Sequence, residues 1–173
     1  MNDSSINFNK YCVGKHISKT NNITRSISQY VALYPKCPIQ MFLSNRSTGK
    51  RNAKTPKQVD EAAIFIRDNM IKYFTHAPYV INLCSNLDWM QRILNEELQL
   101  TVKMNGRGVV VHVGAKKELL LDEAVNNMEL MVRNSLTYAT EECPLLLETS
   151  CGEGTEILVN IEELAGFFYR FNE

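Results

Sequence analysis

Three side chains that could bind a metal ion recur at a constant interval along the chain. His76 and His112 lie 36 residues apart, and Glu148 follows His112 after the same 36 residues. Each of them ends a short apolar run of the kind that forms a β-strand. One strand–helix unit of a parallel barrel takes about 30 to 40 residues. Successive units would therefore bring the three side chains to neighbouring positions on the rim formed by the carboxyl ends of the strands.

His76, His112 and Glu148 together supply two imidazoles and one carboxylate, the ligand set of many catalytic zinc sites. A metal ion at such a site polarises a phosphoryl or carbonyl oxygen and lowers the pKa of bound water towards neutrality. The alternative is structural, because a histidine that ends a strand is often a hydrogen-bonded polar residue and Glu148 could be a strand-end carboxylate. The regular recurrence of metal-binding residue types favours a site.

Strand-like and helix-like segments alternate along the chain. The strand-like runs are residues 10–17, 39–43, 71–76, 108–113 and 144–148. Strict alternation with helices predicts a parallel sheet with right-handed crossovers, which is an α/β fold. Both an open doubly wound sheet and part of an eight-unit barrel fit this pattern. The first strand-like run is not followed by a GxGxxG motif, so the usual dinucleotide-binding argument for the open sheet is missing.

Apolar residues recur at helical spacing in five segments between and after the strand-like runs. In the first four segments the expected buried faces are Ile23, Ile27, Val31 and Tyr34; Val59, Ala62, Ala63, Ile66 and Met70; Leu87, Met90, Leu94 and Leu98; and Leu121, Val125, Met128, Val132 and Leu136. The last segment begins at Asn160 with Glu163 three residues later, a helix-capping pair. We expect this last helix to bury Ile161, Leu164 and Phe168.

The composition describes a chain without a dominant charge or a disulfide framework. The 173 residues carry 19 basic and 19 acidic side chains, so net charge does not indicate a nucleic-acid partner, although a local basic patch is compatible with it. Five cysteines without a CxxC pair suggest a reducing compartment. Neither a signal peptide nor an apolar run near the ~18 residues of a membrane span is present. We therefore expect an intracellular protein, cytoplasmic or nuclear, with no membrane partner.

Four segments resemble, in the same order, the abasic-site endonuclease IV (deoxyribonuclease IV) family. They are VGKHIS (13–18), HAPYVINL (76–83), VVVHVGAK (109–116) and LLLETSCGEG (145–154). The second and fourth are the most specific, because they are similar to the family patterns HAPYLINL and ETTAGQG. The resemblance implies a TIM-type (β/α) barrel, of which this chain holds about five of the eight βα units. Residues 1–173 would then be a single domain, the N-terminal portion of a (β/α)8 barrel.

The resemblance also implies an activity and a ligand set. The family consists of zinc-dependent DNA repair endonucleases that hydrolyse the phosphodiester on the 5′ side of an abasic site. By position, His76 and His112 would bind the first of up to three zinc ions, and Glu148 would bridge it to the second, so these residues would act catalytically through the metal. The remaining ligands of the family lie on later units, so only the ligands of the first zinc are complete here.

Further positions correspond to DNA-binding residues of the family, whose partner is damaged double-stranded DNA. Tyr79 would lie against the DNA at the abasic site, although it could instead be a rim aromatic that packs a loop. Asn45 and Arg46 lie where the family has an asparagine followed shortly by an arginine that enters the duplex, and His16 matches a histidine near the site that is not a ligand. If the polar segment 44–55 faces DNA, Lys50, Arg51 and Lys54 would reach phosphates; the alternative is that this charged loop is simply solvated.

Departures from the family patterns concern residues beside the ligands and the extent of the barrel. The chain has HVGAK where the family often has HPGSH, and Cys151 and Glu153 where alanine and glutamine are usual. Neither change removes a ligand. An unclosed barrel exposes the edges of its first and fifth strands and an apolar layer. We therefore expect a second chain or a C-terminal segment to complete the barrel.

Two other functions are compatible with the same residues. A sugar isomerase or epimerase of the xylose-isomerase type also places His and Glu ligands at strand ends, and activity on free sugars would identify it. A non-catalytic fragment that binds DNA or a partner chain would need no metal. Measuring bound metal separates the non-catalytic fragment from the endonuclease and from the sugar enzyme.

Overall fold

The computed structural model describes residues 13–51 and 55–171, and five strands form one parallel sheet within them. The strands are β1 (Lys15–His16), β2 (Ile39–Met41), β3 (Tyr73–His76), β4 (Val109–His112) and β5 (Leu145–Glu148). Each falls inside a predicted strand-like run but is shorter, and residues 10–12 of the first run lie outside the described residues. The strands lie side by side in chain order, β1-β2-β3-β4-β5. An open doubly wound sheet reverses its strand order, so this sequential order is that of a barrel.

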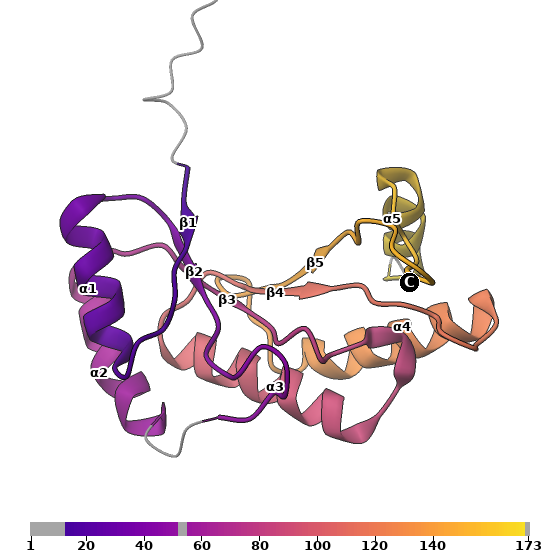
Figure 1. The fold of residues 1–173 in the computed structure, drawn as a ribbon, viewed down its shortest axis with the longest axis horizontal. Coiled ribbons are helices and arrows are strands. Elements are labelled where there is room, and N and C mark those ends of the chain that lie inside the picture. Colours follow the sequence, from indigo (N-terminus) through magenta and orange to yellow (C-terminus); the bar gives the residue numbers. More distant parts are fainter. Residues whose placement is uncertain (1–12, 52–54, 172–173) are drawn as a thin grey trace, which may run out of the picture.

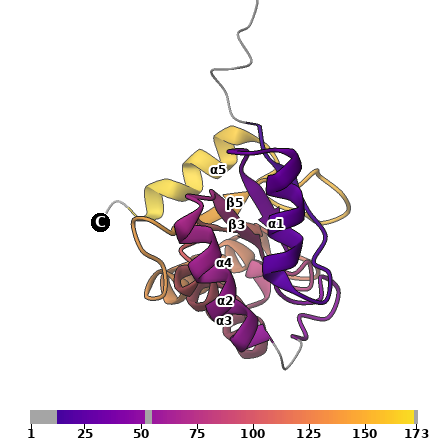
Figure 2. The same ribbon diagram turned by 90° about the vertical axis from the view of Figure 1, so that its left-hand side faces the viewer.

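Helices follow the strands in alternation, as the sequence predicted. They are α1 (Ile23–Leu33), α2 (Thr55–Asp68), α3 (Asp88–Lys103), α4 (Leu121–Leu136) and α5 (Ile161–Phe168), with short 3-10 turns η2 (Leu83–Ser85) and η3 (Tyr169–Phe171). Figure 1 shows α3 and α4 below the strands and α1 and α2 beside β1 and β2, while the opposite side of the central strands carries no helix. The helix α5 lies at the β5 end of the sheet in Figure 1, and in Figure 2 it is drawn above β3 and β5, with α2 and α3 below them.

The strands turn alternate side chains towards the helices and towards the uncovered side of the sheet. In β4, Val109 and Val111 are buried in the apolar core with α3 and α4, whereas Val110 and His112, which alternate with them, remain partly exposed. A second core, made chiefly by β2, β3, α1 and α2, includes Ile27. We call the uncovered side the inner face of the sheet. Its side chains are the ones available to form a site.

The last helix begins as predicted but buries a different face. Asn160 Oδ1 accepts a hydrogen bond from the Glu163 N–H at 2.8 Å, and Glu163 Oε2 accepts one from Val159 N–H at 3.0 Å. Leu164 is buried, but the expected burial of Ile161 and Phe168 is wrong, because they are 68% and 51% exposed. The two lie seven residues apart, on a stripe of the helix that turns away from the core. Phe167 is buried instead.

Several other predicted core residues are also exposed, and most of them lie at the ends of helices. These are Tyr34, Met70, Leu87, Leu121 and Leu136. The end of a helix extends beyond the sheet that it covers, so helical spacing alone overestimates the length of the buried stripe. Within the described residues, no helix is both long enough and apolar enough to cross a membrane.

Candidate metal centre

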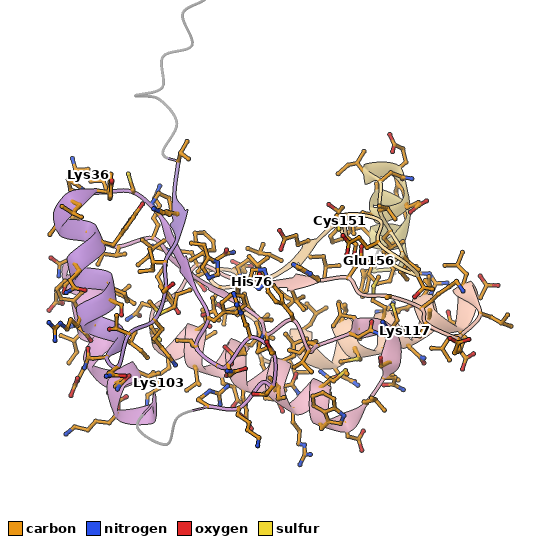
Figure 3. The ribbon with its side chains drawn as sticks, in the orientation of Figure 1. Lys36, His76, Lys103, Lys117, Cys151 and Glu156 are labelled. Carbon is orange, nitrogen blue, oxygen red and sulfur yellow. The ribbon has the colours of Figure 1, made fainter. Side chains whose placement is uncertain are left out.

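His76, His112 and Glu148 meet on the inner face, at the carboxyl ends of β3, β4 and β5. Glu148 Oε2 lies 3.1 Å from His76 Nε2 and 3.2 Å from His112 Nε2. The register of β4 and β5 pairs His112 directly with Glu148. One candidate ligand atom from each residue lies within 4.8 Å of the others. The structure thus brings together the three side chains that the 36-residue interval predicted to be neighbours. Figure 3 shows His76 over the central strands, with Cys151 and Glu156 on the β5 side.

The hydrogen bond on the far side of the His76 ring determines what the ring can offer to Glu148. His76 Nδ1 lies 2.7 Å from the carbonyl oxygen of Ala77. A carbonyl oxygen only accepts, so Nδ1 must carry the proton. In the neutral ring, Nε2 then presents a lone pair towards Glu148 Oε2, which is also an acceptor. A proton or a cation is needed between these two atoms. Such an outer hydrogen bond is the usual way in which a metal-binding histidine is oriented.

Burial differs among the three side chains and leaves one side of the cluster open. His76 is buried, whereas the side chains of His112 and Glu148 are 40% and 47% exposed. The backbone N–H of Ala77 donates to the carbonyl of Val110 at 2.7 Å, which extends the β3–β4 pairing past His76. One imidazole is therefore fixed by the sheet, while the other two groups face solvent. A bound ion would keep a position for water or substrate.

Aromatic rings surround the cluster on the β1 and β2 side. The Tyr79 ring lies edge-on to His76 with a centroid distance of 5.4 Å and is 5.3 Å from the His112 ring. Phe42 lies between them and His16, 5.1 Å from Tyr79 and 4.7 Å from His16. His16 Nδ1 is within hydrogen-bonding distance of Gln40 Oε1, at 2.9 Å. The structure thus places His16 and Tyr79 beside the cluster, and Tyr79 is exposed at its rim.

Asn82, which the sequence patterns did not single out, joins the loops that follow β3 and β4. Its Oδ1 accepts from the N–H groups of Ala115 and Cys84 at 2.9 and 3.2 Å, and its Nδ2 donates to the Ala115 carbonyl at 2.8 Å. Gly114 has φ +104°, and a Cβ there would lie 2.1 Å from Asn82 Oδ1. Asn82 and Gly114 belong to the segments HAPYVINL and VVVHVGAK. Asn82 and Gly114 each lie in a motif that resembles the family, and this shared feature could have identified the contact between the two loops.

The loop of residues 44–51 borders the site on the β2 side. Asn45 Oδ1 accepts from the backbone N–H groups of Ser47 and Thr48, both at 3.0 Å, so this side chain shapes the loop. Arg46 and Lys50 are exposed. A hollow of about 630 Å³ is lined by His16, Ile17, Ser18, Lys19, Phe42, Ser44, Asn45, Arg46, Lys50 and Tyr79. Basic side chains therefore lie on one side of the cluster formed by His76, His112 and Glu148, the candidate metal-binding cluster.

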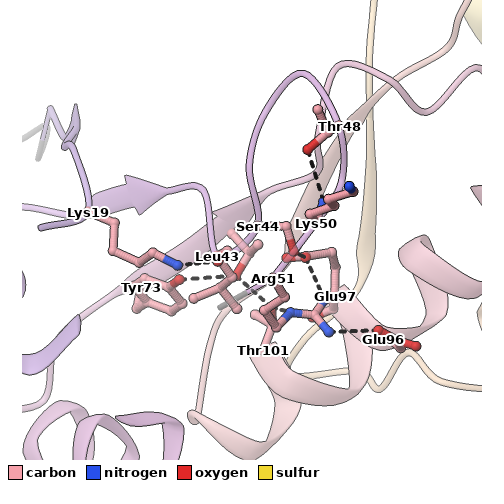
Figure 4. Close-up of polar contacts among 11 residues, drawn as sticks. Lys19, Leu43, Ser44, Thr48, Lys50, Arg51, Tyr73, Glu96, Glu97 and Thr101 are labelled. Atoms are coloured by element: carbon pink, nitrogen blue, oxygen red, sulfur yellow. Dashed lines mark hydrogen bonds and ion pairs between the residues drawn. The ribbon is translucent and has the colours of Figure 1, made fainter. Parts of the chain in front are cut away.

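Arg51 does not point towards this hollow, contrary to the expectation that it reaches phosphates. Its Nη1 and Nη2 form ion pairs of 2.7 Å with Glu96 Oε2 and Glu97 Oε1, and its side chain is only 17% exposed (Figure 4). Nothing in the sequence pattern marked Glu97, which lies within the apolar stripe of α3. Lys54, the other basic residue of this segment, lies outside the described residues.

The loop after β5 is held by a carboxylate rather than by its cysteine. Glu156 Oε2 accepts from the N–H groups of Gly152 and Glu153 at 2.9 and 2.8 Å. The hydrogen bond from the Glu153 N–H, followed by that from Gly152, lowers the pKa of the Glu156 carboxyl. The exposed Cys151 thiol lies 3.7 Å from the same oxygen. Cys151 is thus engaged with Glu156 and outside the cluster of three candidate ligands.

Comparisons with known proteins point in the same direction as this geometry. The chain is 26% identical over 160 residues to a Ureaplasma parvum serovar 3 protein named "Probable endonuclease 4", covering 88% of this chain and 53% of that protein. The chain is similar to endonuclease 4. A Mycoplasma pneumoniae protein of the same name is 28% identical over 132 residues, covering 72% of this chain and 46% of that protein. The chain thus spans about half the length of the curated endonuclease 4 relatives it matches. No protein-family model matches it.

Solved structures confirm the fold. Endonuclease IV from Thermus thermophilus superposes with a TM-score of 0.73 at 19% identity, over 91% of this chain and 58% of that chain. A D-tagatose 3-epimerase-like protein superposes with a TM-score of 0.61 at 15% identity, over 88% of this chain and 58% of that one. The chain therefore folds as about five units of a TIM-type (β/α) barrel, and the predicted resemblance to endonuclease IV is confirmed.

Proposed function

We propose that this chain carries the first part of the active site of a zinc-dependent endonuclease that hydrolyses the phosphodiester 5′ of an abasic site in double-stranded DNA. The observation that carries the proposal is the convergence of His76 Nε2 and His112 Nε2 on one carboxylate oxygen of Glu148. The similarity to endonuclease 4 supplies the reaction class. The donor set fits zinc, because two imidazoles and a carboxylate are ligands that it prefers.

In this proposal His76, His112 and Glu148 hold the ion. When bound, zinc supplies a Lewis acid for the phosphoryl oxygen and makes water acidic near neutral pH. The Ala77 carbonyl keeps the His76 ring in the tautomer that offers Nε2 to the ion. The exposed sides of His112 and Glu148 leave space for the phosphodiester. Further zinc ions would need ligands that lie outside the described residues.

DNA would approach from the side of the hollow described above. Arg46 and Lys50 are exposed there, and basic side chains contact phosphates without reading sequence. Tyr79 projects at the rim between this hollow and the cluster, where an aromatic ring can stack against an exposed sugar or base. Asn45 supports the proposal indirectly, because its side-chain oxygen stabilises the loop that carries Arg46.

A further part of the proposal is that a second chain or a C-terminal segment completes the barrel. Ile161, Phe168 and Tyr169 form an exposed apolar surface on α5 and η3, and the outer edges of β1 and β5 make no strand pairs within the described residues. Open sheet edges and apolar surface favour association with further polypeptide. The segment that completes the barrel would also be the source of any additional metal ligands.

Cleavage of a synthetic abasic-site duplex tests the reaction. The purified chain is incubated with zinc and the duplex, alone and together with the C-terminal half of the Ureaplasma parvum relative. We expect incision 5′ of the lesion in at least one of these mixtures, loss of incision with a chelator, and no incision by His76→Ala. Absence of both incision and selective binding to the abasic duplex in every mixture contradicts the proposal.

A sugar isomerase or epimerase is the second candidate, supported by the similarity of fold to the D-tagatose 3-epimerase-like protein. The same three metal ligands would serve that chemistry. The basic side chains of Lys19, Arg46 and Lys50 around the hollow favour a polyanion over a neutral sugar. Isomerisation of free ketoses by the zinc-loaded chain, without DNA binding, would establish the sugar enzyme instead.

A further inference from the structure

A buried carboxylate lies beneath the loop of residues 44–51. Glu97, on α3, has no exposed surface, and its Oε1 accepts a hydrogen bond from Ser44 Oγ at the beginning of the loop. The same oxygen lies 2.7 Å from Nη2 of Arg51 at the end of the loop. Figure 4 shows both ends of the loop meeting at this side chain. One carboxylate therefore ties the first and last residues of the loop to α3.

The loop between these two ends has its own internal order. Asn45 N–H donates to the Lys50 carbonyl at 2.8 Å, and Gly49 N–H donates to the Asn45 carbonyl at 2.8 Å. Gly49 has φ +67°, and a Cβ there would lie 2.5 Å from Ile93 Cδ1 of α3. The loop is thus a compact turn seated on α3. Moving its ends would move Arg46 and Lys50 together.

A second loop contacts the residue before the 44–51 loop from the β1 side. Lys19 Nζ donates to the carbonyl of Leu43, the residue before Ser44. Burial lowers the pKa of Lys19, and the charge of Glu97 acts in the opposite direction. Lys19 and the 44–51 loop both line the hollow beside the metal-binding cluster. Glu97 therefore contacts the 44–51 loop directly, and the Lys19 loop is joined to the start of the same loop through the Leu43 carbonyl.

Stability alone is a poor explanation for a carboxyl group at this position. Burial raises the pKa of the Glu97 carboxyl, and the interactions with Arg51 and Ser44 oppose that shift only in part. Glu97 Oε2 is buried without a hydrogen-bond partner within the described residues. Buried ion pairs can often be replaced by apolar side chains without loss of stability. An apolar residue could not direct Ser44 and Arg51, from the two ends of the loop, to one point.

We propose that Glu97 is a positioning residue that fixes the 44–51 loop so that Arg46 and Lys50, together with the neighbouring Lys19, present a preformed phosphate-binding surface beside the metal-binding cluster. This inference rests on the proposed function. Because Glu97 already holds the loop in one conformation, the loop loses little conformational freedom when DNA binds. This preorganisation increases the affinity for DNA. Glu97 touches neither the DNA nor the metal. Its effect should therefore appear in DNA binding and in loop order, but not in zinc affinity.

The test compares Glu97→Gln and Arg51→Gln with Glu96→Gln in the full chain. Glu96 is the matched control, because it pairs with the same Arg51 but is 56% exposed. Three quantities are measured: the Kd for an abasic-site duplex by fluorescence anisotropy at fixed salt, the zinc Kd by calorimetry, and hydrogen exchange at the amides of Asn45 and Gly49. Thermal unfolding checks that each variant is folded. If Glu97→Gln does not fold, Arg51→Gln carries the test, since its side chain reaches solvent.

We expect Glu97→Gln and Arg51→Gln to weaken duplex binding about tenfold and to accelerate exchange at Asn45 and Gly49. Zinc affinity should be unchanged, and Glu96→Gln should remain within about twofold of wild type. If Glu97→Gln and Arg51→Gln leave amide exchange and duplex affinity unchanged, the inference is overturned. A parallel loss of zinc affinity in these variants would also overturn it, because it would indicate a general loss of structure. If the wild-type chain binds no abasic duplex, the proposed function fails, while the exchange data still decide whether Glu97 holds the loop.

Discussion

His76 Nε2 lies 3.1 Å from Glu148 Oε2, although 72 residues separate the two in the chain. The opposite nitrogen of His76 donates to the Ala77 carbonyl, so the short contact brings two acceptor atoms together unless a proton or a cation lies between them. His112 Nε2 approaches the same oxygen. This arrangement is the chemical reason for proposing a metal centre at this rim of the sheet.

Removing either histidine of the cluster should abolish tight zinc binding. We expect His76→Ala and His112→Ala each to weaken zinc affinity by more than about a hundredfold, since loss of an outer-shell partner alone costs about ten- to a hundredfold. Zinc at about one hundred times its Kd should raise the free energy of unfolding of the wild-type chain by about 2.7 kcal/mol. The same zinc concentration should not stabilise either variant. Calorimetry and thermal unfolding measure both effects. His16→Ala is the control: this third histidine lies beside the cluster but outside it, and equal loss of zinc binding there would contradict the assignment.

Two glycine-to-alanine substitutions should change stability in opposite directions. Gly114→Ala should lower the free energy of unfolding by about 2 kcal/mol or more, because φ is +104° and the new Cβ would lie 2.1 Å from Asn82 Oδ1. Gly166→Ala, within α5, should raise it by about 0.5 to 1 kcal/mol, because no atom lies within 4 Å of the new Cβ and alanine favours the helix. Urea denaturation measures both. Tolerance of alanine at Gly114 would mean that the Asn82 contact does not restrain the two loops.

Two buried thiols should make the folded state less stable at high pH. Burial raises the pKa of both Cys84 and Cys143 from 9.0 to about 11. Between these pH values the unfolded chain loses thiol protons while the folded chain retains them. The contribution of the two thiols to the free energy of unfolding is therefore complete below about pH 9 and is lost as the pH rises towards 11. The double variant Cys84→Ala/Cys143→Ala should show a shallower decline over this range. Urea unfolding at several pH values measures the slopes, and parallel slopes would show that the thiols do not contribute.

Without further barrel units, the chain should expose an apolar surface that promotes association with other molecules. We expect it to self-associate or to bind a hydrophobic dye, and we expect Ile161→Lys/Phe168→Lys to reduce both effects, since these side chains are exposed on α5. Leu33→Lys, at an exposed position on α1, is the comparison for the effect of added charge. Size-exclusion chromatography with light scattering measures the mass. A wild-type monomer that binds no dye would contradict the expectation that a second chain or segment covers this surface.

Much of the fold could be predicted because its elements depend on local patterns. The strand-like runs that end at His76, His112 and Glu148 became β3, β4 and β5, and Asn160 caps the last helix through Glu163 as its spacing indicated. The outward turn of Ile161 and Phe168 was not predictable in the same way. Helical spacing identifies apolar stripes, but the neighbouring elements decide which stripe is covered.

The sequence by itself determined which residue types recur at each strand end, and therefore which three side chains share one rim. Parallel strands in chain order convert an equal interval along the chain into proximity in space. Only the tertiary structure decided that Arg51 turns inwards to Glu97, that Asn82 joins two loops, and that the Ala77 carbonyl sets the tautomer of His76. These contacts depend on directions of individual polar groups between segments far apart in the chain, and no periodic pattern encodes them.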